Sequence, residues 1–336
     1  MNKTYCSPLA AGILFFLGCT SSILAQDLHY SQIYMNPQHQ NPALAGIFEG
    51  NSRFSAQYRS QWETVPVQYR TLAAGFDTKL YSQEHNMLAA GLLLQRDQAG
   101  DGGLTWTQIG LNINAAHAIS PKQIISLGLG LAFVQRNVNF TKLKFNNQWD
   151  GDIYNPSLPS KETLNSTSGL KTSLLAGLNW HFQQGHSSRT VADIGISSAH
   201  VNRPNISFQK DGVHQLPVRY STYGQAYFQS GTMIDYMAFT HFQYMQKAMT
   251  TLIGAGMRYW LSEESAIQLA CATRLGDAII PSLTIQRKQW TVGMSYDVNI
   301  SGFKVATGRK GGFEIAATYT AAPVKPIKEM KVCPVF

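Results

Sequence analysis

The residues of this 336-residue chain that could bind a metal or catalyse a reaction are few and scattered. The run Asp97–Gly103 (DQAGDGG) holds two carboxylates and three glycines, whereas a calcium loop needs more oxygen ligands at regular spacing. A glycine-rich hairpin loop is therefore the favoured interpretation of this run. The nine histidines form no pair at metal-ligand spacing, and His181 and His241 fall within predicted strands. We expect no metal site and no cofactor.

Nucleophilic catalysis has no clear set of residues either. No Ser, His and Asp arrangement suggests a triad, and no glycine-rich loop is of the phosphate-binding kind. Asp, Arg and Ser side chains could still converge inside a barrel, as in an outer-membrane hydrolase. We expect a protein that is not an enzyme. Cys271 lies on an aliphatic strand face and Cys333 in the tail, so no disulfide is expected between them.

The elements that position these side chains are predicted to be β-strands. Within Leu104–Ala118, aliphatic residues alternate with Gln, Gly and Asn, which is the period of a strand and not of a helix. The same alternation recurs in Leu170–Phe182 and in Trp290–Val298. Strands are predicted at 52–62, 68–78, 87–96, 104–118, 122–136, 170–182, 188–198, 217–228, 232–243, 246–259, 264–274, 277–287, 289–298 and 311–320.

Strand length and aromatic placement distinguish a membrane barrel from a soluble sandwich. Several segments are about twice as long as the five or six residues of a globular strand, which is enough to cross a bilayer at a tilt. Aromatic residues lie near segment ends, where a barrel has its girdles: Trp106, Trp180, Tyr259, Trp260, Trp290 and Tyr319. The predicted fold is all-β, a transmembrane antiparallel β-barrel of about 14 strands.

Composition agrees with an exported membrane protein. Residues 1–25 have the features of a signal peptide, with Lys3 before an apolar stretch and small residues before Gln26; a lipoprotein signal with Cys19 lipidated is the alternative. Charged residues make up 14%, against about a quarter in typical soluble domains. The formal net charge is +8, but Lys and Arg are dispersed, so no nucleic acid partner is expected.

Loop lengths predict an orientation in the outer membrane. Every second gap between strands is short, whereas 137–169 and 199–216 fall in the other set. Outer-membrane barrels have short periplasmic turns, so both termini are expected in the periplasm. The loop Asn137–Gly169, with Trp149 and Tyr154, is either a folded lid or docking surface, or a variable loop without a fixed partner. The tail 321–336 is either solvated or a docking peptide.

The stretch Ser31–Trp62 is irregular because it is rich in Asn-Pro and Gly. Residues 26–51 are predicted to enter the barrel 52–320 from the periplasmic side and to fold into or under the lumen, with Tyr34, Met35 and Leu44 buried against the barrel interior. The candidates for plugging the lumen or for binding partners are Tyr34, Met35, Asn36, Pro37, Asn41, Pro42, Tyr58, Arg59, Trp62, Trp149 and Tyr154.

Four motifs in order resemble the PorP/SprF family of outer-membrane proteins in Bacteroidetes. They are QDLHYSQIYMNPQHQNPALAG from Gln26, YRSQW with FDTKL, SSAHVNRPNISF from Ser197, and the ending CPVF. The QHQ between the two Asn-Pro pairs departs from the usual apolar filling. The resemblance implies a type IX secretion system component that supports export or surface attachment of adhesins, including gliding adhesins.

Two functions follow as hypotheses. The first is a non-enzymatic secretion component that binds a secreted adhesin or its C-terminal domain, together with periplasmic secretion-system or peptidoglycan-associated proteins. Outer-membrane lipid would surround it. The second is an outer-membrane diffusion channel or small-molecule transporter. The two differ in whether the lumen is open, and many predicted lumen-facing residues are small.

Overall fold

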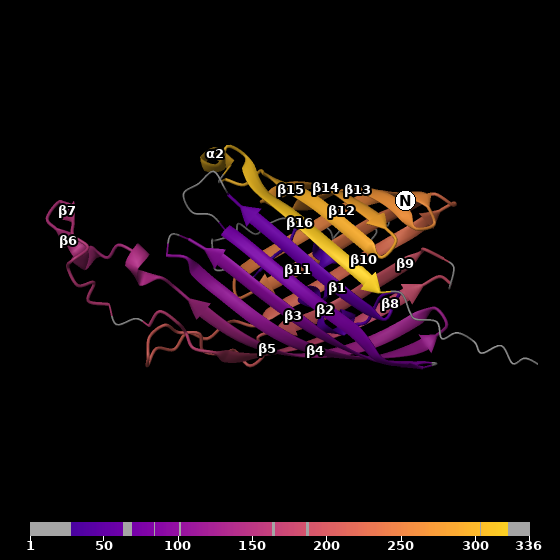
Figure 1. Cartoon of the computed structure of the whole chain (residues 1–336), viewed down its shortest axis with the longest axis horizontal. Helices are drawn as coiled ribbons and strands as arrows, with labels where there is room; N and C mark the ends of the chain where they lie inside the picture. The colour runs from indigo at the N-terminus through magenta and orange to yellow at the C-terminus, as the bar shows by residue number, and fades with distance from the viewer. Residues whose placement is uncertain are drawn as a thin grey trace, which may run out of the picture.

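Fourteen antiparallel strands close into one barrel in the computed structural model, which describes residues 28–62, 69–83, 85–100, 102–162, 165–185, 188–302 and 304–321 (Figure 1). Neighbours in the chain are neighbours in the wall, and β1 pairs with β16 to close it. This confirms the predicted fold. The strands of the wall are β1 (Ser52–Gln61), β2 (Tyr69–Gln83), β3 (Asn86–Ala99), β4 (Leu104–Ser120), β5 (Gln123–Asn137), β8 (Lys171–Gln183), β9 (Val191–Ala199), β10 (Arg219–Ser230), β11 (Ile234–Met245), β12 (Ala248–Ser262), β13 (Ser265–Arg274), β14 (Ala278–Arg287), β15 (Trp290–Asn299) and β16 (Lys310–Ala321).

All fourteen predicted strands exist, and the differences lie at their ends. β2 and β3 continue past their predicted limits and pair down to Gln83↔Asn86, because a bulge at Lys79/Tyr81 absorbs the loss of register there. β3 and β4 pair up to Ala99↔Leu104, so Asp97–Gly103 belongs to a hairpin, as expected. Pro281 lies inside β14, and the pairing with β15 skips Ile280 and Pro281, since proline has no N–H to donate.

The two faces of the wall have the predicted composition. On β4, Ile109, Leu111 and Ile113 are exposed on the outer face, whereas Asn112 and Asn114 are buried inside. Outward aromatic rings cluster near the strand ends, including Trp290 and Tyr319, whose tilted rings have centroids 5.0 Å apart. Aliphatic residues outside and polar residues inside are the pattern of a membrane barrel.

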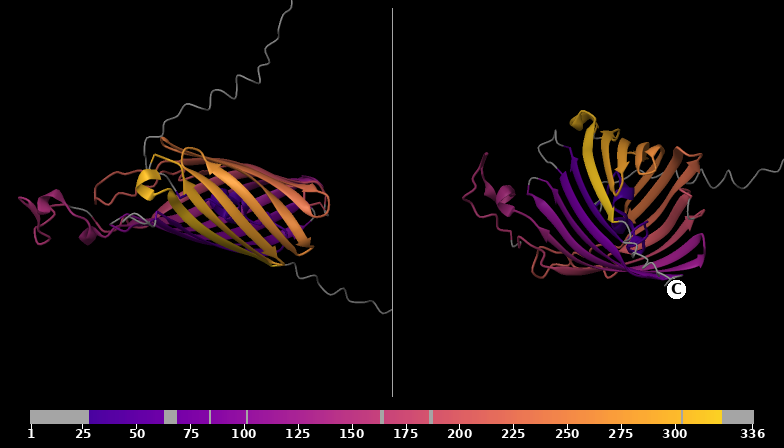
Figure 2. Two further views of the ribbon diagram at one scale, coloured as in Figure 1. Left: turned by 90° about the horizontal axis from the view of Figure 1, so that it is seen from above. Right: turned by 45° about the vertical axis from the view of Figure 1, so that its right-hand side comes forward.

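The two ends of the barrel differ. At one end, here called the short-turn end, the hairpins β2–β3, β4–β5, β8–β9, β10–β11, β12–β13 and β14–β15 turn. At the other, the long-loop end, the connection between β5 and β8 carries the small sheet β6 (Trp149–Asp150) and β7 (Ile153–Tyr154). Figure 2 shows this loop extending beyond the barrel at the end where α2 (Lys304–Thr307) lies.

No helix among the described residues is long and apolar enough to span a membrane. The predicted signal at 1–25 and nearly all of the predicted tail 321–336 lie outside the described residues. Cys271 is free and exposed on the wall, while Cys333 also lies outside the described part of the chain.

Candidate functional site

The described residues before β1, Leu28–Gly50, lie inside the barrel and are called here the N-terminal segment (Figure 2). The segment forms the turns η2 (Ile33–Met35) and η3 (Pro42–Leu44) and one turn of helix, α1 (Pro37–Gln40). Both Asn-Pro pairs start such a turn, because proline at the first position has its φ preset and no N–H to satisfy. The Asn41 side chain also accepts a hydrogen bond from the Ala43 N–H, 2.8 Å away.

A buried charge cluster holds the start of the segment near the long-loop end. The Glu314 carboxylate accepts the backbone N–H groups of Ser31 and Gln32 at 2.8 and 2.7 Å. Arg59 and Asp297 form an ion pair of 2.8 Å, and the Ser31 hydroxyl donates to Asp297 at 2.6 Å. Removing one member of such a buried pair costs about 3–5 kcal/mol, because the other charge is left uncompensated.

Arg274 completes this cluster from β13. It donates to Asp297 at 3.0 Å and to the Ser31 hydroxyl at 2.8 Å. Arg59 is 2% exposed and Glu314 1%, so these charges are shielded from water. The two arginines face Glu314 and Asp297, Asp277 accepts from Arg274 at 2.8 Å, and the segment supplies further hydrogen-bond partners.

Asn41 fixes the middle of the segment. Its side-chain NH₂ donates to the backbone oxygens of Leu178 and Ile196, at 2.9 and 3.1 Å, and to the Tyr223 hydroxyl at 3.2 Å. These partners belong to β8, β9 and β10. Gln38 reaches the opposite wall, where it donates to the Phe76 oxygen on β2 at 3.1 Å. The segment therefore bridges strands on both sides of the lumen.

The end of the segment is held near the short-turn end. Ser126 donates to the Ala43 oxygen at 3.1 Å, and Asn114 donates to the Ala45 oxygen at 2.7 Å. The Gly46 N–H donates to Asp77 at 2.8 Å, and Asp77 is paired with Arg53 at 2.7 Å.

Glycines in the wall make room for these contacts. A Cβ added at Gly128 would overlap the backbone of Pro42 and Ala43, and one at Gly177 would overlap the Asn41 side chain. A Cβ added at Gly91 would overlap the Gln38 side chain, and one added at Gly293 would overlap the Gln32 side chain. Small lumen-facing residues thus leave space that this chain itself occupies.

Aromatic packing complements the polar contacts. Tyr34 packs edge-on against Phe239 with ring centroids 5.4 Å apart, beside Ile33, Met237 and Ile280. Burial raises the pKa of Tyr34, so its hydroxyl stays protonated. Met35 and Leu44 are 4% and 3% exposed, as predicted, and Tyr34 is half-buried.

The path of the segment differs from the expected one. We expected it to begin at the short-turn end, but Ser31 lies against Arg59, Arg274 and Glu314, which are near the long-loop ends of their strands. The segment runs from the long-loop half of the lumen to the short-turn end. Buried carboxylates of the wall account for the difference, because Glu314 accepts the Ser31 and Gln32 N–H groups and Asp297 accepts the Ser31 hydroxyl.

The predicted site residues do not form one site. Tyr34, Met35, Asn36, Pro37, Asn41 and Pro42 lie together in the lumen, and Arg59 joins them there. Tyr58 is exposed on the outer face, and Trp62 follows β1 at the long-loop end, with its N–H donating to the Gly311 oxygen at 2.7 Å. Trp149 and Tyr154 form a separate pair in the long loop, with ring centroids 5.9 Å apart.

Sequence reasoning missed Glu314, Asp297 and Arg274 as site residues. The signal was present, since both carboxylates occupy the polar positions of aliphatic strands, where an unpaired charge is costly. His241 is buried in the lumen, and His181 faces it and bonds to Asp193 at 2.9 Å. The described residues contain no cluster of metal-binding side chains.

A cavity of about 950 Å³ remains below the segment at the short-turn end. Ile47 and Phe48 of the segment line it together with Arg189, Arg258 and Trp260 of the wall. Arg258 stacks 4.2 Å from the Tyr227 ring centroid, and Arg189 pairs with Asp235 at 2.9 Å. The cavity is thus lined by fixed cations and rings.

The closed barrel, with its aliphatic outer face and aromatic rings near the strand ends, defines a membrane β-barrel of the outer-membrane type. The family model "Type IX secretion system membrane protein PorP/SprF" matches residues 22–319, and the chain belongs to this family. No curated protein matches the chain.

Solved structures are similar to this chain at low identity. The TodX deltaS2S3 mutant, a monoaromatic hydrocarbon channel, is 10% identical with a TM-score of 0.51, covering 84% of this chain and 94% of that one. The toluene transporter TbuX of Ralstonia pickettii is 10% identical with a TM-score of 0.48, covering 84% and 91%. The translocator domain of NalP from Neisseria meningitidis is 10% identical with a TM-score of 0.34, covering 86% and 96%. The likeness to the TodX mutant concerns the fold alone.

Proposed function

We propose that this protein is a non-enzymatic component of the type IX secretion system that acts by binding other proteins. It supports the export or the surface attachment of secreted proteins such as adhesins, including gliding adhesins. It binds the adhesin, or the adhesin's C-terminal domain, at one end of the barrel. At the other end it docks to periplasmic secretion-system or peptidoglycan-associated proteins.

The occupied lumen is the observation that carries this proposal. The N-terminal segment is hydrogen-bonded to strands on both sides of the barrel. Its Ser31 bonds to Glu314 of the wall near the long-loop end, its Asn41 bonds to the wall at mid-height, and its Ala45 bonds to Asn114 of the wall nearer the short-turn end. A polar lumen that is filled by the chain itself favours recognition at the ends over diffusion through the middle. We take this segment to be a plug.

The orientation in the proposal follows from the loops. With short turns in the periplasm, the loop with β6 and β7 faces outward, and β1 begins and β16 ends on the periplasmic side. The outward loop presents Trp149, which is 48% exposed beside Tyr154, and exposed aromatic residues of this kind anchor protein interfaces.

A pull-down tests the binding function. The full-length protein with a tag is isolated from outer membranes in mild detergent, and co-isolated proteins are identified. We expect a large secreted adhesin or periplasmic secretion components. Isolation of the barrel alone, with unchanged surface adhesins after gene deletion, would contradict the proposal.

Planar-bilayer recording tests the alternative, a diffusion channel or small-molecule transporter. The purified full chain should show no steady ohmic conductance if the segment plugs the lumen. Steady conductance of the unmodified protein would favour the channel.

A further inference from the structure

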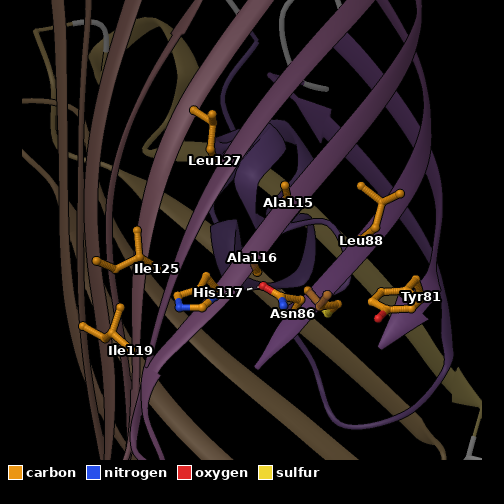
Figure 3. Close-up of a pocket in the computed structure, with 10 residues that line it drawn as sticks. Tyr81, Asn86, Leu88, Ala115, Ala116, His117, Ile119, Ile125 and Leu127 are labelled. Atoms are coloured by element: carbon orange, nitrogen blue, oxygen red, sulfur yellow. Dashed lines mark hydrogen bonds between the residues drawn. The ribbon is translucent and has the colours of Figure 1, made fainter. Parts of the chain in front are cut away.

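An open groove of about 490 Å³ lies on the outer wall near the short-turn end, and the site described above does not use it (Figure 3). Its lining comes from β2, β3, β4 and β5, and includes Tyr81, Leu88, Ala115, His117, Ile125 and Leu127. We call it the outer groove.

Strand register explains why the wall is hollow there. Leu88 pairs with Ala115, and Ala115 pairs with Leu127, so a methyl group stands between two leucines on the outer face. One step toward the middle of the membrane, Ile113 and Leu129 fill the corresponding positions. The groove is therefore a local dent in a continuous aliphatic surface.

A polar pair lies at the mouth of the groove. His117 Nδ1 and Asn86 Oδ1 are 2.9 Å apart, and both side chains are exposed on the outer wall (Figure 3). Polar groups on this surface are costly in hydrocarbon unless further partners satisfy them. The pair therefore places the mouth at the boundary between acyl chains and headgroups.

Two further basic residues lie in the turns at this end of the wall. The His85 ring lies 6.4 Å from the His117 ring, and Lys122 sits in the turn between β4 and β5. Among the residues that the structure describes, no carboxylate lines the groove. The dent thus combines an aliphatic floor with hydrogen-bonding and cationic groups at one end, which matches a lipid with a phosphate headgroup.

Aromatic residues flank the dent on both sides. Tyr81 on β2 borders it, and Trp180 on β8 pairs with Ile125 at its far side. Rings at this level anchor a barrel in the interface. Between them, Asn86 and His117 take the girdle positions, so the girdle is open at this point.

We propose that the outer groove binds a glycerophospholipid, with one acyl chain against Ala115 and the phosphate at His117. The choice of a phospholipid over a lipopolysaccharide rests on the proposed orientation, in which the short turns face the periplasm.

Lipid retention tests the proposal. The full-length protein is purified from outer membranes, washed with detergent, and the phospholipid bound per barrel is measured by mass spectrometry. Phosphatidylethanolamine is then added back as the probe. Ala115→Phe fills the dent and should lower the affinity roughly tenfold, the effect of displacing about two methylene groups.

The matched control is Ala74→Phe. Ala74 is an exposed alanine on the outer face of β2 and does not line the groove, so its variant should retain lipid as the unmodified protein does. His117→Ala should lower the affinity for phosphatidylethanolamine roughly five- to tenfold by removing the phosphate partner. Heat-dependent gel mobility checks that each barrel is folded.

Three results would overturn the inference. The first is equal retention by Ala115→Phe and Ala74→Phe. The second is retention of lipopolysaccharide in place of phospholipid. The third is loss of a co-isolated protein from Ala115→Phe with bound phospholipid unchanged, which would assign the groove to a protein partner.

Discussion

Gly128→Ala probes the fit between the N-terminal segment and the wall. Gly128 lies on β5 and faces the lumen where the segment passes, so an added Cβ overlaps the Pro42 and Ala43 backbone. Non-bonded heavy atoms pack at about 3.5 Å, so the segment must move by roughly 1 Å. The strand itself accepts alanine without backbone strain, because Gly128 has no positive φ.

The size of the effect follows from the hydrogen bonds that such a shift breaks. The bonds from Ser126 to Ala43 and from Asn114 to Ala45 measure 3.1 and 2.7 Å, and the bond from Asn41 to Leu178 measures 2.9 Å. Bonds lengthened by roughly 1 Å are lost. Three lost bonds of about 0.5–1.5 kcal/mol each, with buried groups left unpaired, give about 2–5 kcal/mol. The docked segment is then disfavoured roughly thirtyfold to several thousandfold.

Gly110→Ala is the matched control. Gly110 is a glycine of neighbouring strand β4, and a Cβ there would meet Leu93 and Ala132 at 3.8 and 3.9 Å, an ordinary contact. Both substitutions change the entropy of the unfolded chain equally. Only Gly128→Ala should move the segment.

Two assays report the docked state. Chymotrypsin cleaves after aromatic residues and leucine, so it reports exposure of Tyr34 and Leu44, and planar-bilayer recording reports opening of the lumen. The unmodified protein and the Gly110→Ala variant should resist chymotrypsin and show no steady conductance. The Gly128→Ala variant should be cleaved in the N-terminal segment and should show steady conductance. If Gly128→Ala matches Gly110→Ala in both assays, the steric argument is refuted.

Three further substitutions test other contacts. Glu314→Gln removes the charged acceptor of the Ser31 and Gln32 N–H groups, while Arg59 keeps its pair with Asp297. It should destabilise the docked segment by about 1.5–3 kcal/mol, seen as faster chymotrypsin cleavage, whereas Glu263→Gln in an exposed turn should not. Asn41→Ala removes three donated hydrogen bonds and should also speed chymotrypsin cleavage. Asn147→Ala, at an exposed position in the long loop, is the control. Unchanged cleavage of the Asn41→Ala variant would contradict the role of Asn41. Trp149→Ala should weaken binding of an outward partner by about 2 kcal/mol, seen as less co-isolated protein, while the melting temperature of the barrel stays the same. Undiminished co-isolation would show that Trp149 is not part of the interface.

The wall could be predicted from the sequence because its signal is local. Alternation at period two over Leu104–Ala118 or Trp290–Val298 is a property of consecutive residues, and the turn residues between strands limit the register. The ends of β2 and β3 were predicted less well, since the bulge at Lys79/Tyr81 has no marker in the chain.

The path of the segment could not be predicted because its partners are remote. Ser31 meets Glu314 across 283 positions of sequence, and Arg59 meets Asp297 across 238. Nothing near Ser31 indicates which strands face it, whereas the Asn-Pro pairs do indicate the local turns at Pro37 and Pro42. The sequence therefore predicted the local turns of the N-terminal segment, but it did not predict the direction in which the segment runs through the lumen.

The chemistry of the contacts suggests where the segment can be released. Near the long-loop end, Glu314, Asp297 and the two arginines act as one unit, because losing any member leaves a buried charge. At mid-height, Asn41 makes neutral hydrogen bonds that are lost one at a time. Near the short-turn end, Ile47 and Phe48 border the cavity of about 950 Å³, and a partner entering from that side meets them first. A partner that enters at the short-turn end would thus act on the weaker contacts, while the charge cluster keeps residues 31 and 32 in place.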